Sequence, residues 1–199
     1  MAQRRIDKVF AENLGLTFGG CVRDQILTVF TRDIPQAAGV RWPLVPFVGA
    51  EEKRLFKLRW AALLQGVGIW AARDAFPEIR ADEKLTRKVL FAMKTYADQA
   101  MQKKLLGTFS EEALKGYNEL RQRFERLALT GEPEKEAFAR AFLSAVWDKP
   151  AESFEGDRVA QTATMVGLAF GLFVKVGNVT RNQDSSYERG SLTKPQKKD

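Results

Sequence analysis

The chain has 199 residues, of which 45% are hydrophobic and 29% charged, the proportions of an ordinary globular protein with one well-filled core. It contains no histidine and a single cysteine, Cys21, which excludes Ser-His-Asp and Cys-His catalysis, a Cys/His zinc site and an internal disulfide within this chain. The formal net charge is +7, and residues 51–130 carry sixteen Lys and Arg against eleven Asp and Glu, which favours a negatively charged partner.

Apolar residues at helical spacing dominate the N-terminal part of the chain. They predict a helix over 3–14, ended by Gly15, and a second helix over 20–31. The segment 34–50, IPQAAGVRWPLVPFVGA, contains three prolines and two glycines. We therefore expect it to be an ordered loop without regular helix, held down by its own apolar side chains.

The strongest helix is predicted over 51–75, where apolar residues on both sides indicate burial between neighbouring helices. Further helices are expected over 82–106 and 111–129, each preceded or begun by a capping residue. Another is expected to start with Pro133 in its first turn and to end before Pro150.

The last predicted helix covers about 157–176, and the chain from residue 178 onward is polar and basic, which is typical of disorder. The fold class that follows is all-α. We expect a single-domain helical bundle of about six or seven helices over residues 1–177, with an ordered Pro-rich loop and a flexible, disordered basic tail over 178–199.

The stretch LTRKVLFAMKTYADQ, residues 85–99, places positive charge around an aromatic ring. At 100° per residue, Leu85, Val89 and Met93 fall on the inward side of the helix, and Phe91 falls among basic residues on the other side. Cations contact backbone phosphates, and bases stack on an exposed ring. Basic residues of the next helix would extend this face into one strip if the two helices are antiparallel neighbours. The predicted nucleic-acid-binding residues, for RNA or DNA, are Lys84, Arg87, Lys88, Phe91, Lys94, Lys115, Arg123 and Arg126.

A structural explanation of the same face is also open. The charges would then form a solvated helix face, and Phe91 would be covered by the 34–50 loop or by a neighbouring subunit.

The acidic pairs Glu51/Glu52, Asp82/Glu83 and Glu111/Glu112 fall in first turns of predicted helices, where the helix dipole and capping explain them better than a metal site does. No catalytic residue, metal site or cofactor is predicted, and an enzyme is the least supported class.

The helix over 157–176 carries a second candidate surface. Residues 159–174 are uncharged, and Ala163, Gly167 and Gly171 lie on one small-residue stripe that would let a partner helix approach closely. The uncharged run is shorter than the roughly 20 residues of a membrane span and stops at Lys175. We therefore expect no integral membrane span.

Residues 32–72, RDIPQAAGVRWPLVPFV and the Ala/Leu-rich helix after it, resemble part of the small helical subunit of CRISPR surveillance complexes, a likeness that does not extend into the C-terminal half. The resemblance implies a non-catalytic subunit of a nucleoprotein complex. We interpret the chain as such a helical binding subunit that uses its basic helix face.

The alternatives are a protein-interaction module (an immunity protein, adaptor or assembly factor) docking on a partner or on itself through the apolar last helix, and a membrane-associated protein. The single cysteine and the absence of an apolar run behind the first basic residues predict a cytoplasmic location.

Overall fold

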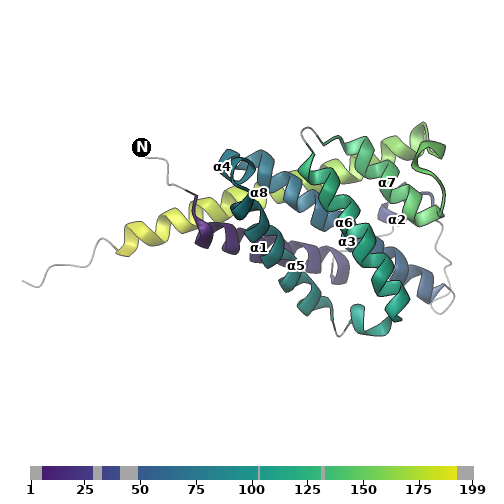
Figure 1. The fold of residues 1–199 in the computed structure, drawn as a ribbon, viewed down its shortest axis with the longest axis horizontal. Coiled ribbons are helices and arrows are strands. Elements are labelled where there is room, and N and C mark those ends of the chain that lie inside the picture. Colours follow the sequence, from purple (N-terminus) through teal and green to yellow (C-terminus); the bar gives the residue numbers. More distant parts are fainter. Residues whose placement is uncertain (1–5, 29–32, 41–48, 103, 131–132, 192–199) are drawn as a thin grey trace, which may run out of the picture.

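The computed structural model describes residues 6–28, 33–40, 49–102, 104–130 and 133–191, with side chains as far as Asn182. These residues form eight α-helices and two short 3-10 turns, with no strand among them, so the all-α prediction is confirmed (Figure 1). In chain order the elements are α1 (Lys8–Leu27), α2 (Asp33–Ala37), α3 (Ala50–Ala75), α4 (Pro77–Ala81), α5 (Glu83–Met101), η1 (Leu106–Thr108), α6 (Glu111–Leu129), α7 (Lys135–Trp147), η2 (Ala151–Ser153) and α8 (Asp157–Ser191).

Helix α3 is the centre of the bundle. It contacts α1, α5, α6, α7 and α8, and the stretch from Trp60 to Ile69 is buried on every side. Aromatic rings from its neighbours close around it, with Trp60 against Phe142 of α7 and Trp70 stacked on Phe138. This environment explains why the sequence of α3 is apolar on both sides.

The predicted end of the first helix at Gly15 is wrong, because α1 runs without a break from Lys8 to Leu27. Gly15 and Gly19 lie where α1 packs against α5. A β-carbon on Gly15 would stand 2.5 Å from the carbonyl oxygen of Val89, and one on Gly19 would stand 2.7 Å from that of Met93. The two glycines therefore permit a close approach of two backbones rather than ending a helix.

Helix α8 continues to Ser191, so the predicted helix end near residue 176 is wrong and the helix crosses the boundary expected at 177/178. In Figure 1 its C-terminal part extends beyond the rest of the bundle. Each residue added to an existing helix gains a backbone hydrogen bond, so a polar sequence without proline does not by itself end one. The predicted flexibility of the tail stays a prediction for 192–199, which lie outside the described residues.

The segment predicted as a Pro-rich loop begins with the short helix α2, which was not expected. Pro35 fits there because the first turn of a helix leaves its N–H groups unpaired in any case. The indole Nε1 of Trp147 donates to the carbonyl oxygen of Ala38 (2.9 Å), and the hydroxyl of Thr162 donates to that of Ala37 (3.2 Å). These bonds hold the start of the segment on α7 and α8, whereas 41–48 lie outside the described residues.

The predicted helix starts are confirmed by their caps. The Asp82 carboxylate accepts from the backbone N–H of Lys84 (2.8 Å) and begins α5, and the Ser110 hydroxyl accepts from that of Ala113 and begins α6. The acidic pairs lie at these positions, with Glu51 and Glu52 in the first turn of α3. Helix α7 starts at Lys135, slightly later than Pro133 suggested.

Candidate nucleic-acid-binding surface

Phe91 lies on the outer side of α5 and is 67% exposed. Leu85, Val89 and Met93 point inward and are buried, as the helical periodicity predicts. Because two thirds of the ring is open to solvent, Phe91 adds little to the core of the folded chain. Phe91 is therefore on the surface of the single chain.

Three cations accompany this ring on α5. Lys84 is exposed, and Arg87 pairs with Glu83 one turn earlier (Nη2 to Oε1, 2.5 Å), both side chains being about three-quarters exposed. Lys88 reaches across to Glu12 of α1, with 2.9 Å between Nζ and Oε2. We call Lys84, Arg87, Lys88 and Phe91 the α5 ridge.

Lys94 is half-buried and is turned toward α6. Burial raises the pKa of the Glu125 carboxyl on α6, and the nearby charges of Arg121 and Lys94 oppose that rise. Lys94 therefore belongs to the edge between α5 and α6, where an acidic neighbour already compensates its charge. Like Lys88, it is a half-buried cation with an acidic neighbour on another helix.

The basic residues of α6 do not continue the α5 ridge. Helix α6 packs chiefly on α3, and α5 packs chiefly on α1. Arg123 and Arg126 line a hollow that also includes Arg59 of α3 and Asp148 after α7. Lys115 is exposed on α6 but does not line that hollow. The single strip expected from the sequence is thus divided into two basic regions.

A buried polar network that was not predicted from the sequence joins α3, α5 and α6. Gln65 donates to the Tyr117 hydroxyl (2.7 Å), which donates to Asp98 (3.1 Å), and the guanidinium of Arg121 donates to the other oxygen of Asp98 (3.0 Å). Burial raises the pKa of Tyr117 far above its usual range, so its hydroxyl remains a neutral donor. Arg121 follows Tyr117 by one turn on the inward face of α6. A charged residue on the inward face of a helix indicates a buried polar partner, so this spacing is the sequence signal that could have revealed the network.

The three small residues expected to pack against a partner helix have different environments on α8. Ala163 is buried, Gly167 lies under the side chain of Lys135 (3.4 Å from an ideal β-carbon), and Gly171 is open, with no atom within 4 Å of such a carbon. Leu168, between the two glycines, is 65% exposed. The open part of the stripe is therefore limited to the neighbourhood of Leu168 and Gly171.

By length and composition alone, α8 could cross a membrane. The stretch Asp157–Asn182 contains a window of mean hydropathy 1.5, of which 28% is buried against the bundle. The core helix of a soluble protein meets the same criteria, so the expectation that the chain has no integral span stays a prediction.

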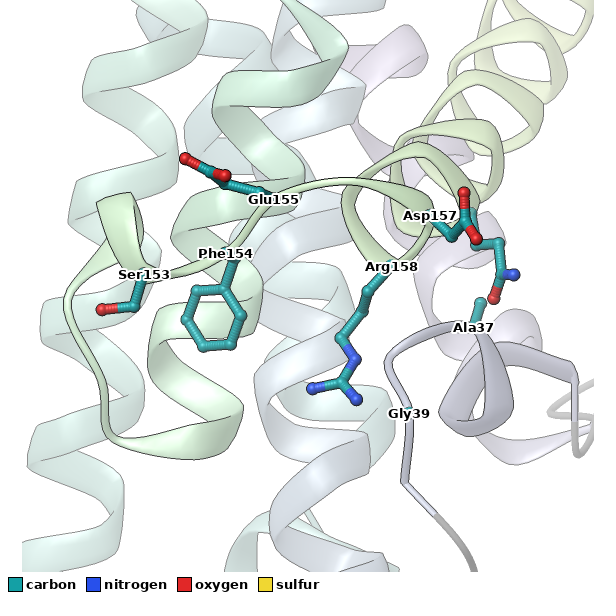
Figure 2. Close-up of a pocket in the computed structure, with 8 residues that line it drawn as sticks. Ala37, Gly39, Ser153, Phe154, Glu155, Asp157 and Arg158 are labelled. Atoms are coloured by element: carbon teal, nitrogen blue, oxygen red, sulfur yellow. The ribbon is translucent and has the colours of Figure 1, made fainter.

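A further hollow of about 470 Å³ lies where α2, η2 and the start of α8 meet (Figure 2). Arg158 points into it beside Gly39, and its guanidinium lies 5.3 Å from the ring centre of Trp147. Glu155 and Asp157 also line the hollow. Because two carboxylates flank an arginine that already stacks on an aromatic ring, this hollow is a poorer site for a polyanion than the α5 ridge.

Reactive groups of other kinds are scarce in the part of the chain that the structure describes. No group of three His, Cys, Asp or Glu side chains there could hold a metal ion. Burial raises the pKa of the Cys21 thiol, helped by the charge of Asp24 and opposed by that of Arg23, which reduces its thiolate fraction.

Comparison of the chain with protein-family models, with curated proteins and with solved structures finds no match.

Proposed function

We propose that the protein is a non-catalytic helical subunit that binds single-stranded nucleic acid through the α5 ridge, as part of a larger nucleoprotein assembly. The observation that carries the proposal is the 67% exposure of Phe91 among cations of the same helix. Burying such a side chain would stabilise the protein by about 1.5–3 kcal/mol. An exposed ring can therefore gain that free energy when a partner buries it. A nucleic-acid base that stacks on the ring does so, and such stacking tolerates any base sequence.

The cations of the ridge support the proposal because their present partners are easily exchanged. Lys84 and Lys88 are one helical turn apart, about 6 Å along the axis, and Arg87 lies between them. Exposed ion pairs such as Arg87–Glu83 contribute about 0–1 kcal/mol, so a phosphate can replace the carboxylate at little cost. An arginine can bind that phosphate through two parallel hydrogen bonds.

The charges are tested by reversing Arg87 and Lys88 together to glutamate. We expect this variant to lose binding to labelled single-stranded RNA and DNA in fluorescence anisotropy titrated over a salt series. For the parent, log Kd should change linearly with log salt, with a slope of about 0.7 per phosphate contact. Lys149→Glu with Lys175→Glu is the matched control, because it reverses two exposed cations outside the ridge and changes the net charge equally. An equal loss in both variants would mean that only net charge matters, and binding by the Arg87/Lys88 variant at the parental level would remove the ridge from the site.

The ring is tested in the same titration by Phe91→Ala. Binding should weaken by about 1–3 kcal/mol if a base stacks on Phe91. The melting temperature should barely change, because the ring is exposed. Leu129→Ala, which removes another exposed apolar side chain, should leave both quantities unchanged. A fall of several degrees in the melting temperature of Phe91→Ala would instead assign the ring a structural role.

A second candidate function is that of a protein-interaction module docked through α8, here with a second copy of the chain. It is favoured by the 65% exposure of Leu168 next to the open Gly171. Leu168→Glu should then shift a dimeric parent to monomer in sedimentation velocity runs over a concentration series, with Leu129→Glu as control. A parent that is monomeric at high concentration speaks against self-association, and recovery of the parent only with detergent would point to a membrane.

A further inference from the structure

A hollow of about 480 Å³ opens between α3, α6 and α7, on the part of α6 that carries Arg123 and Arg126. Its volume lies within the usual range of small-ligand pockets, roughly 300–1,000 Å³. Leu58 and Leu120 give it an apolar wall, and Gly116 leaves a gap in α6 where no side chain fills the space. The hollow thus has room for the body of a small organic molecule.

Three arginines, Arg59, Arg123 and Arg126, line this hollow. None of them makes an ion pair or a side-chain hydrogen bond with another residue of the described ranges. Burial lowers the pKa of Arg59, and the charge of Asp148 only partly opposes this. A half-buried guanidinium without a hydrogen-bonded anion is stabilised when a ligand supplies one.

The other polar groups of the hollow indicate what kind of anion would fit. Glu119 and Asp148 also line it, so the formal charge around the hollow is smaller than three arginines alone would give. Their carboxylates repel a bare anion but accept hydrogen bonds from hydroxyl or amino groups. The arrangement therefore favours a molecule that joins a phosphate to a body with hydrogen-bond donors and a flat or apolar part.

We infer that the hollow between α3, α6 and α7 is a binding site for a small organic phosphate of mononucleotide size, whose phosphate lies among Arg59, Arg123 and Arg126. The hydroxyl or amino groups of the ligand then reach Glu119 and Asp148, and its body packs on Leu58 and Leu120. The site is separate from the α5 ridge and does not depend on nucleic-acid binding there.

The test is isothermal titration calorimetry of the full chain with adenosine monophosphate, inorganic phosphate and adenosine at fixed salt. We expect the monophosphate to bind more tightly than either of its two parts. Arg59→Gln and Arg123→Gln should each weaken binding roughly tenfold or more, the effect of losing one charge-assisted hydrogen bond. Lys115→Gln is the matched control, because it removes an exposed cation of the same helix that does not line the hollow.

Gly116→Leu gives an independent test by filling the hollow. A β-carbon at Gly116 meets no atom within 4 Å, so this variant should fold with an unchanged or higher melting temperature and should no longer bind. Any of three results would overturn the inference. They are no heat from the parent, equal binding by the two arginine variants and Lys115→Gln, and inorganic phosphate that binds as tightly as the monophosphate. The Arg87/Lys88 charge-reversal variant should bind the monophosphate normally, which separates this result from that of the α5 ridge.

Discussion

Asp98→Ala is expected to lower the free energy of unfolding by about 3 kcal/mol, at the lower end of the range for breaking a buried ion pair. The substitution removes the acceptor of both the Arg121 guanidinium and the Tyr117 hydroxyl. Arg121 is only 4% exposed and would keep a buried charge, with the Asn118 side-chain oxygen (2.7 Å) and the more distant Glu125 carboxylate (3.6 Å) as its remaining partners. Urea unfolding followed by circular dichroism measures the loss.

Two further variants isolate the cause of this effect. Glu119→Ala removes an exposed carboxylate of α6 and should change stability by no more than about 0.5 kcal/mol. Adding Arg121→Met to Asp98→Ala removes the stranded charge as well, and much of the lost stability should return. If Asp98→Ala alone loses less than about 1 kcal/mol, the network is no stronger than a surface pair.

Gly15→Ala is expected to destabilise the protein by about 1–3 kcal/mol or more, the usual cost of overpacking. The added methyl group would lie 2.5 Å from the Val89 carbonyl oxygen and 2.7 Å from the β-carbon of Ala92, so α1 and α5 would have to separate. Thermal and urea unfolding measure the change.

The same substitution at Gly116 of α6 is the matched control. The added methyl group meets no atom there, and alanine exceeds glycine in helix propensity by about 1 kcal/mol, so Gly116→Ala should be stabilising. Opposite signs at the two positions would establish the close approach of α1 and α5. Stabilisation by Gly15→Ala would contradict the packing described for these helices.

Periodicity and capping were sufficient to predict most of the helices. Asp82 and Ser110 are confirmed as caps, and the inward residues of α5 are those expected from 100° spacing. Some of the errors come from residues whose effect depends on tertiary contacts. From the sequence, Gly15 was predicted to end a helix, but in the fold it lets the α5 backbone pack close to α1. Only the packing of α5 distinguishes the two roles.

The candidate site was only partly predictable for the same reason. The local sequence placed Phe91 on the outward side of its helix, because one helix is enough to define two sides, but it left open whether the 34–50 loop covers the ring, which is 67% exposed. It could not place Arg123 and Arg126, whose surroundings depend on how α6 is oriented against α3 and α7. The polar network around Asp98 required three helices to meet, which no single segment encodes.

The glycine contact between α1 and α5 has a consequence for any ligand of the α5 ridge. With Gly15 and Gly19 set against the α5 backbone, α5 has little freedom to rotate about its axis or slide along α1. The backbone that carries Phe91 is therefore held in place before anything binds. A preorganised surface loses little conformational entropy on association, so more of the contact free energy appears as affinity.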